Sequence, residues 1–258
     1  VFIATSIFSI FFISMKFNRE FANQIIDDLI NCVDTASKEI MQIYNSDNFE
    51  TSDKADGSPL TLADKASNQI ITEGLKKITP DIAVISEETF EDTILKALPN
   101  LYWLVDPLDG TREFINKNDE FTVNIALIED RKPVFGIVAA PVFEKRWHGS
   151  IFDNYHSDKS IPDVLRIVMS KSHKNDNDKS FLNYLNEKVV NYKIIEKGSS
   201  LKLCAIADNE ADIYPRFGPT SEWDIAAAHS VLSAYGGCVL KVDDFSCLLY
   251  TSDAADDA

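Results

Sequence analysis

The amino-acid sequence predicts an α/β protein whose N-terminal half is of the α+β type. Three observations support this class: a long amphipathic helix, paired β-rich runs in the middle of the chain, and strands that alternate with helices over residues 165–235. With 258 residues, 45% of them hydrophobic, the chain is long enough for one large domain or two packed subdomains.

The first elements along the chain are expected to be helical. Apolar residues recur at helical spacing over residues 17–44, which predicts a long amphipathic helix. Residues 51–60 are rich in Ser, Asp, Lys, Gly and Pro, which is typical of an exposed loop. A second helix is expected over about 62–77, followed by a short buried strand over 82–85.

Strands follow in the middle of the chain. The runs 121–128 and 133–139 are rich in β-forming residues and are separated by Glu-Asp-Arg-Lys, which predicts a hairpin. Residues 145–151 are expected to pair onto that hairpin. Further on, strands near 165–169 and 192–195 alternate with helices near 200–207 and 223–235, as in an α/β half.

The predicted division is an N-terminal subdomain over residues 15–155 with the metal site and a C-terminal α/β subdomain over 156–246. Residues 1–14 are uncharged and apolar, too short to span a bilayer, and lack the basic start of a signal peptide. We interpret them as translated sequence upstream of a start at Met15, with an export or anchor segment as the alternative. Residues 247–258 lack apolar periodicity and are interpreted as an atypical, truncated tail.

The charge balance restricts the partners. The chain carries 25 Lys and Arg against 41 Asp and Glu, a net charge of −16, which disfavours nucleic acid polymers and anionic membranes. A phosphate ester can bind only where metals or local basic residues reverse this field. The four cysteines and four histidines show no zinc spacing, so we expect reduced thiols in a cytoplasmic protein. A peripheral position at the inner face of the plasma membrane stays open.

The most informative segment is Leu-Tyr-Trp-Leu-Val-Asp-Pro-Leu-Asp-Gly-Thr-Arg at residues 101–112. A buried strand is expected to end in a turn that holds Asp106 and Asp109. Two adjacent carboxylates repel each other unless a cation joins them, and a divalent metal is the usual solution. Gly110 and Thr111 then offer backbone N–H groups and a hydroxyl to an anion. The alternative is an Asp-rich turn in which Asp106 caps the following helix.

Three further acidic residues lie at predicted strand or helix ends, where α/β folds gather their chemistry. Asp64 opens the second helix and could be an ordinary first-turn acid. Glu87 follows a strand and could form a solvated pair with Glu88. Asp224 opens a late helix and could complete a capping box with Ser221. The metal hypothesis depends on the whole set.

Several of these residues belong to stretches that resemble the signatures of a known family. The stretches Glu87-Glu88, Asp106-Pro-Leu-Asp-Gly-Thr111 and Trp223-Asp-Ile-Ala-Ala are similar to the signatures of the lithium-sensitive, Mg²⁺-dependent phosphatases related to inositol monophosphatase. The resemblance covers roughly residues 17–242. It implies a layered αβαβα sandwich of the inositol monophosphatase and fructose-1,6-bisphosphatase type. After about Ser246 the chain no longer resembles the family, and Asn209 stands where relatives often carry Gly.

The resemblance also implies roles for individual residues. The Mg²⁺ ligands would be Glu87, Asp106, Asp109, Asp224 and the carbonyl of Leu108. Gly110 and Thr111 would bind the scissile phosphate, and Asp64 with Thr111 would activate the attacking water, with Glu87 also counted among the catalytic residues. Hard oxygen donors of this kind suit Mg²⁺, and two or more ions about 3.5–4 Å apart can stabilise both the attacking and the leaving oxygen. We expect about two or three ions.

Three more stretches are similar to the 3′(2′),5′-bisphosphate nucleotidase branch of that superfamily: Glu120-Phe-Thr-Val-Asn-Ile-Ala-Leu127, Ser170-Lys-Ser-His173, and Gly198-Ser-Ser-Leu-Lys202 continuing to residues 214–220. That branch hydrolyses adenosine 3′,5′-bisphosphate, a by-product of sulfate assimilation, to AMP and phosphate. The positions of Ser170, His173, Ser199 and Lys202 contact the nucleotide there. Lys202 and His173 are cations available to the second phosphate, with Arg216 assisting, although ordinary surface charge is the alternative.

The sequence therefore predicts a Mg²⁺-dependent phosphomonoesterase acting on adenosine 3′,5′-bisphosphate, with a small molecule as its partner. The same chemistry on inositol phosphate or histidinol phosphate is the nearest alternative. A non-catalytic module that binds nucleotide or metal is the alternative from another class. Neither stable membrane insertion nor a nucleic acid partner is expected, and both a monomer and a homodimer remain open.

Overall fold

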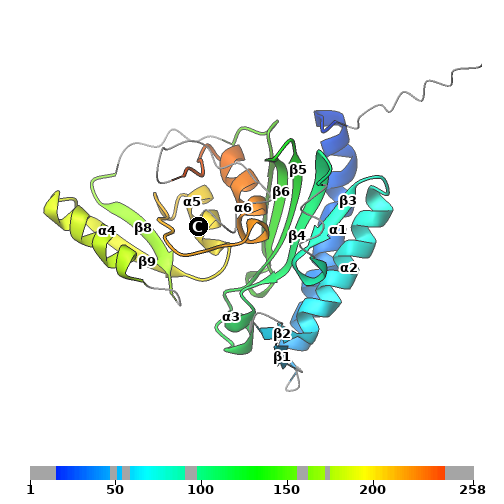
Figure 1. Cartoon of the computed structure of the whole chain (residues 1–258), viewed down its shortest axis with the longest axis horizontal. Coiled ribbons are helices and arrows are strands. Elements are labelled where there is room, and N and C mark those ends of the chain that lie inside the picture. The colour runs from blue at the N-terminus through cyan, green and yellow to red at the C-terminus, as the bar shows by residue number, and fades with distance from the viewer. Residues whose placement is uncertain are drawn as a thin grey trace, which may run out of the picture.

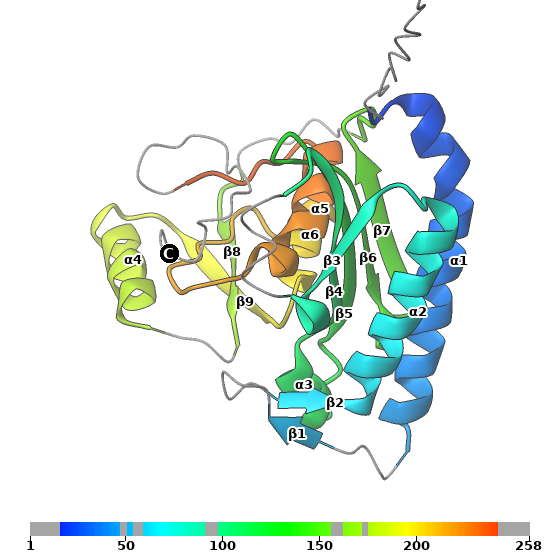
Figure 2. The ribbon, with the colours of Figure 1, turned by 45° about the vertical axis from the view of Figure 1, so that its right-hand side comes forward.

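The structure, a computed structural model, describes residues 16–46, 51–53, 59–90, 98–155, 162–171 and 175–241. Within them the elements stack in five layers: two long helices, a five-stranded sheet, a second pair of helices, a two-stranded sheet and a last helix (Figure 1). The order is unchanged when the molecule is turned (Figure 2). This stacking confirms the expected αβαβα sandwich.

The first layer consists of α1 (Arg19–Tyr44) and α2 (Leu62–Ile78). Asn18 caps α1, because its side chain accepts the backbone N–H of Phe21, a donor that the helix itself leaves free. The buried stripe of α1 recurs every three or four residues and includes Ile25, Leu29, Val33, Ala36 and Ile40. Both helices match the predictions for residues 17–44 and 62–77.

The second layer is a sheet in the order β3-β4-β5-β6-β7. β3 runs parallel to β4, and each later pair is antiparallel. The strand bounds are β3 (Ala83–Ser86), β4 (Leu101–Asp109), β5 (Thr122–Glu129), β6 (Lys132–Ala140) and β7 (Lys145–Ser150). The hairpin over 121–139 and the third strand over 145–151 are thus confirmed. The 3₁₀ turn η3 (Pro141–Phe143) joins β6 to β7.

The aspartate segment is not the turn that the sequence predicts. β4 continues through it to Asp109, with Asp106 opposite Asn124 and Asp109 opposite Thr122. Three steps along β4 therefore face two steps along β5, which is a bulge of one residue. Pro107 lies inside the bulge, where its missing N–H costs no ladder hydrogen bond.

Residues 51–60 are likewise not wholly a loop. β1 (Thr51–Asp53) and β2 (Pro59–Thr61) pair as an antiparallel ribbon, with Thr51 opposite Thr61. The ribbon contacts α2 and α3 (Thr111–Ile115). Those tertiary contacts override the local preference of a Ser- and Pro-rich segment, and no pattern within ten residues reveals them.

The third layer covers the other face of the sheet with α5 (Leu201–Ala207) and α6 (Glu222–Ala234). α6 is rich in buried alanines and lies directly on β6. Gly136 of β6 allows this close approach, since a Cβ atom there would lie 2.2 Å from the carbonyl oxygen of Ala227. The position of α6, and of Asp224 in its first turn, is therefore set by backbone contact with the sheet.

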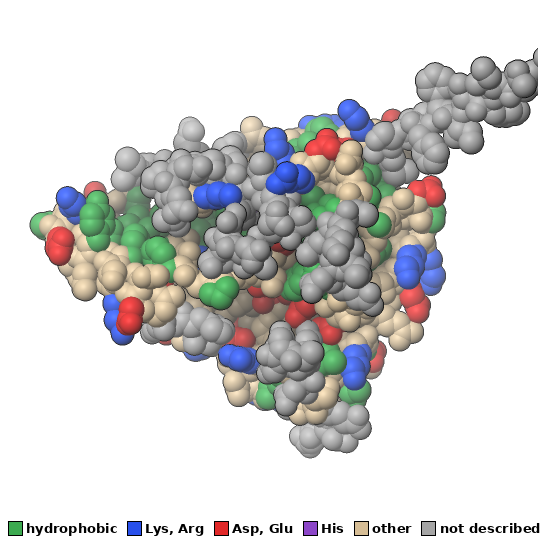
Figure 3. Space-filling view, in the orientation of Figure 1, with side chains coloured by type: hydrophobic (Ala, Val, Ile, Leu, Met, Phe, Trp, Pro, Cys, Tyr) green, Lys and Arg blue, Asp and Glu red, His purple; other side chains and the backbone are tan. Residues whose placement is uncertain are grey.

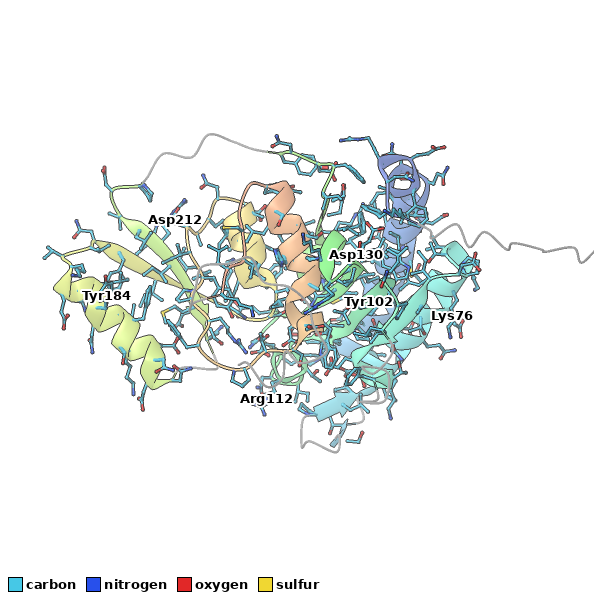
Figure 4. All side chains as sticks on the ribbon, turned by 45° about the horizontal axis from the view of Figure 1, so that its top comes forward. Lys76, Tyr102, Arg112, Asp130, Tyr184 and Asp212 are labelled. Atoms are coloured by element: carbon cyan, nitrogen blue, oxygen red, sulfur yellow. The ribbon has the colours of Figure 1, made fainter. Side chains whose placement is uncertain are left out.

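The last two layers are β8 (Leu165–Ser170) beside β9 (Tyr192–Lys197) in a parallel pair, and α4 (Asp176–Glu187) outside them. Both strands were expected, whereas α4 was not. Its sequence is mostly polar, and only a narrow stripe with Phe181, Leu182 and Leu185 packs against β8 and β9. Tyr184 lies on its exposed face (Figure 4). Such a narrow stripe gives a weak periodic signal.

Other expectations concern the ends and one turn. Residues 1–14 and 247–258 lie outside the described residues, and the boundary between residues 155 and 156 stays a prediction. Asn209 has a φ of 60°, the left-handed conformation that Asn tolerates in place of Gly. None of the helices in the described part combines the length and the apolar character that crossing a membrane requires.

Candidate active site

A pocket of about 290 Å³ lies where the ends of several elements meet. Most of the predicted site residues line it: Glu87, Asp109, Gly110, Thr111, Ser170, Ser199, Lys202 and Asp224. Glu87 begins the 3₁₀ turn η1 (Glu87–Thr89) directly after β3. Acidic side chains are visible in the hollow between the two halves of the molecule (Figure 3). Arg112 of α3 also lines the pocket and is labelled in Figure 4.

Asp106 is not among the residues that line the pocket and is only 2% exposed. Burial raises the pKa of its carboxyl well above the usual range, and the charges of Glu87, Asp109 and Asp224 raise it further. Glu87 is also in hydrogen-bond contact with it. The alternative role for Asp106 is wrong, since Gly110 precedes α3 and no side chain caps that helix. Asp106 instead accepts the N–H of Leu108 at 3.1 Å.

Asp224 belongs to the same charge cluster. Burial, and next the charge of Asp109, raise its pKa to about 7, although hydrogen bonds from Ser221 and Thr220 oppose this shift. Four carboxyl groups from β4, η1 and α6 therefore influence one another through space. A buried cluster of one sign requires either shared protons or a cation.

Two of these carboxylates leave one oxygen available to a cation. All hydrogen bonds to the side chain of Asp109 end on Oδ2, and all those to the side chain of Asp224 also end on Oδ2. Each residue thus keeps Oδ1 without a protein donor among the described residues. In the present side-chain conformations, no three His, Cys, Asp or Glu residues of the described ranges have the geometry of a metal site. The donors fit a hard ion that keeps several waters, as Mg²⁺ does.

Asp64 is 1% exposed and fulfils two structural roles at once. Its Oδ2 accepts the N–H of Thr61 at 2.7 Å and completes the capping box of α2. Its Oδ1 accepts the hydroxyl of Thr111 at 3.1 Å. The helix-start interpretation and the functional interpretation are therefore both compatible with this residue. The same holds for Asp224, which forms a capping box with Ser221 and also lines the pocket.

Gly110 supplies the backbone conformation that the turn requires. Its φ is 93°, in the region that favours glycine, and a Cβ atom would lie 3.2 Å from the carbonyl oxygen of Glu120. The chain can therefore leave β4 and start α3 at once, which brings the hydroxyl of Thr111 within 3.3 Å of the Leu108 carbonyl oxygen. The carbonyl of Leu108, a predicted metal ligand, thus lies beside Thr111.

The pocket also has basic residues, which come from the C-terminal half. Lys202 is 6% exposed, and its ammonium group donates to the carbonyl oxygen of Ser199 at 2.6 Å. Burial lowers the pKa of Lys202, and the charge of Asp109 opposes that shift. Arg216 also lines the pocket and donates to the carbonyl oxygen of Gly218 at 3.0 Å. His173 lies outside the described residues.

Comparisons with known proteins bear on this arrangement. Residues 22–253 match the Inositol monophosphatase family. The chain belongs to this family. It is 43% identical over 227 residues to the 3′(2′),5′-bisphosphate nucleotidase CysQ of Buchnera aphidicola, covering 84% of each chain. It is 39% identical to CysQ of Escherichia coli K12, covering 83% of this chain and 89% of the relative.

Solved structures of the inositol monophosphatase family have a similar fold. The crystal structure of CysQ from Bacteroides thetaiotaomicron is 33% identical, covers 84% of this chain and 88% of its own, and has a TM-score of 0.71. An inositol monophosphatase of Thermotoga maritima, TM1415, shares the fold with a TM-score of 0.67 at 20% identity, with 83% of this chain and 84% of its own covered. Members of this family are metal-dependent phosphatases, which agrees with the oxygen donors described above.

Several residues at the site were not predicted. Ser200 donates its N–H to Asp109 at 2.8 Å and its hydroxyl to the carbonyl oxygen of Asp224 at 2.6 Å. Thr220 donates to Asp224 at 2.9 Å, and Thr122 contacts Ser199. Ser200 is the last residue of the Gly-Ser-Ser turn, Thr220 ends the stretch over residues 214–220, and Thr122 lies in the stretch that begins at Glu120, so all three belong to motifs named from the sequence. No role was predicted for Thr122, because its position inside a strand gives no sign of a contact with Ser199.

Proposed function

We propose that this protein is a divalent-metal-dependent phosphomonoesterase that hydrolyses adenosine 3′,5′-bisphosphate to AMP and phosphate. One observation carries the proposal. The same pocket is lined by the carboxylates of Glu87, Asp109 and Asp224 and by a buried lysine, Lys202. In a protein with a net charge of −16, this lysine offers a second phosphate a local positive charge.

The carboxylates of Glu87, Asp106, Asp109 and Asp224, with the Leu108 carbonyl, would hold about two or three Mg²⁺ ions. When bound, Mg²⁺ supplies positive charge that stabilises the phosphoryl oxygens and makes a nearby water more acidic. The protein supplies the positions of the oxygens. Ser199 and Ser200 hold Oδ2 of Asp109, and Thr220 holds Oδ2 of Asp224. The Oδ1 atom of each carboxylate is then available to a metal ion.

Thr111 and Asp64 move the proton in this proposal. The hydroxyl of Thr111 donates to Asp64, so its oxygen can accept a proton from the attacking water while its own proton passes to Asp64. Asp64 is buried beside Thr111, and its Oδ1 is the atom that accepts this hydroxyl. Gly110 and Thr111 bind the scissile phosphate. No cysteine or histidine nucleophile is needed.

The second phosphate lies against Ser170, Ser199 and Lys202. An anion beside Lys202 compensates the burial of its ammonium group, whereas an uncharged sugar hydroxyl offers no such compensation. This difference favours a bisphosphate over inositol phosphate or histidinol phosphate. We also propose that His173, which lies outside the described residues, contacts the second phosphate. The proposed location is the cytoplasm. Whether the protein is a monomer or a homodimer stays a prediction.

A substrate panel tests the proposal. Phosphate release is measured with adenosine 3′,5′-bisphosphate, inositol 1-phosphate and histidinol phosphate, with and without Mg²⁺. We expect kcat/KM to be at least about tenfold higher for the bisphosphate and activity to require the metal. A tenfold preference for inositol phosphate would assign the chain to the alternative substrate. Binding of the bisphosphate without turnover would favour the non-catalytic module.

A further inference from the structure

A chain of buried polar groups leads from the sheet to Asp109. The hydroxyl of Thr122 lies 2.5 Å from the hydroxyl of Ser199, and Ser199 donates to Oδ2 of Asp109 at 2.6 Å. Thr122 belongs to β5, is fully buried, and lies opposite Asp109 in the strand register. The group that ends this chain is one that the proposed function assigns to metal binding.

The proton count gives the chain a direction. An ionised carboxylate only accepts hydrogen bonds, so the single proton of Ser199 points to Asp109. Thr122 must then donate to Ser199, and its own oxygen is left to accept. The amide oxygen of Asn124 lies 3.4 Å from Thr122, while its amide nitrogen is buried without a partner among the described residues. Turning this amide over gives the nitrogen an acceptor, and every donor then points toward Asp109.

Ser199 depends on this support. Its φ is 49°, the left-handed region that few residues other than glycine adopt, so its backbone is held by its surroundings. Its side chain also lines the pocket, and other rotamers of the hydroxyl are open to it. The contact with Thr122 selects the rotamer that reaches Asp109. Without that contact the Ser199 hydroxyl is no longer held toward Asp109, which is then fixed by the backbone N–H of Ser200.

We propose that Thr122 is a positioning residue that acts through Ser199 to fix the carboxylate of Asp109 for metal binding. The inference rests on the proposed function, because it takes Asp109 as a metal ligand. Thr122 is fully buried and cannot touch the substrate. Its effect is on how well Asp109 is oriented before a cation arrives, and so on metal affinity.

The test compares Thr122→Val, which keeps the shape and removes the hydroxyl, with Thr122→Ser, which keeps the hydroxyl. Binding of Mn²⁺ to each full-length protein is measured by electron paramagnetic resonance in the absence of substrate. Loss of a group that orients a metal ligand costs about 10- to 100-fold in affinity, so the valine variant is expected to bind Mn²⁺ at least about tenfold more weakly. The serine variant is expected to stay within about threefold of the wild type.

A double variant separates positioning from a general effect on the fold. In a Ser199→Ala background, Thr122→Val should weaken Mn²⁺ binding no further, because the connection to Asp109 is already broken. Thermal unfolding of each variant checks that it is folded. Should Thr122→Val not fold, Thr122→Ala takes its place in both comparisons.

Two results overturn the inference while the proposed function stands. One is a folded Thr122→Val protein that binds Mn²⁺ as tightly as the wild type. The other is a Thr122→Ser protein that is as impaired as the valine variant. A wild-type protein that binds no Mn²⁺ and hydrolyses no phosphate ester overturns the proposed function itself, and the inference with it.

Discussion

The hydroxyl of Thr111 donates to Oδ1 of Asp64 at 3.1 Å, which joins the first turns of α3 and α2 across 47 positions of the chain. The other oxygen of Asp64 is held by the backbone N–H of Thr61. A single buried carboxylate thus caps a helix with one oxygen and orients a hydroxyl at the pocket with the other. The start of α2 therefore fixes the position of Asp64, the proposed proton acceptor.

Replacing Thr111 tests this relationship. Thr111→Val removes the hydroxyl at constant shape and is expected to lower kcat by at least about 10²-fold, because positioned acid–base groups contribute that much or more. Thr111→Ser keeps the hydroxyl and should retain most of the activity. Steady-state kinetics in saturating Mg²⁺ measures both. A valine variant within about threefold of the wild-type kcat would remove Thr111 from the proton path.

Asp106→Asn tests the metal site. The substitution keeps the size of the side chain and removes its charge, so turnover is expected to fall by at least about 10²-fold. The fold should remain intact, because one like charge is removed from the neighbourhood of Glu87, Asp109 and Asp224. Phosphate release and thermal unfolding are measured on the same preparation. Near-normal activity would contradict the role given to Asp106.

Gly136→Ala tests the contact between α6 and the sheet. The added Cβ atom would lie 2.2 Å from the carbonyl oxygen of Ala227, and neither backbone can move freely. Overpacking of this kind should lower the free energy of unfolding by about 1–3 kcal/mol. Gly218→Ala is the matched control, since its nearest neighbour is a side-chain nitrogen of Asn175 at 3.7 Å. Equal stability of the two variants in urea would refute the close-contact account.

His229 gives a pH dependence of known sign. Burial in α6 lowers its pKa from 6.5 to about 4. The unfolded chain therefore binds the proton more readily, and stability is complete above pH 6.5 and falls as the pH drops toward 4. The contribution lost by pH 5 is about 2 kcal/mol. Urea unfolding of wild type and His229→Gln at pH 7.5 and 5.0 isolates it, and an identical loss in both proteins would contradict the assignment.

The sequence predicts the strongly periodic elements well and the non-local ones poorly. The long helix over 17–44 and the hairpin over 121–139 are confirmed, because each carries its own pattern of apolar residues. The ribbon of β1 and β2 depends on pairing between Thr51 and Thr61 and on contacts with α2, which no local pattern encodes. α4 was missed because its apolar stripe is narrow.

The site shows the same division. Glu87, Asp109 and Asp224 come from three separate stretches and line one pocket, as the set of motifs predicts. Asp64 and Asp224 each form the capping box of a helix, so that interpretation is confirmed, whereas their functional roles stay a prediction. Thr122 lies in the stretch that begins at Glu120, but the sequence does not show which residue it contacts. Its importance in our proposal comes from a contact with Ser199, 77 positions away.

Diffraction at the manganese absorption edge, from crystals soaked in Mn²⁺, tests the central claim most directly. The account predicts anomalous peaks within bonding distance of carboxylate oxygens of Glu87, Asp106, Asp109 and Asp224. Peaks only elsewhere on the surface, or none at Mn²⁺ concentrations that support turnover, would contradict it.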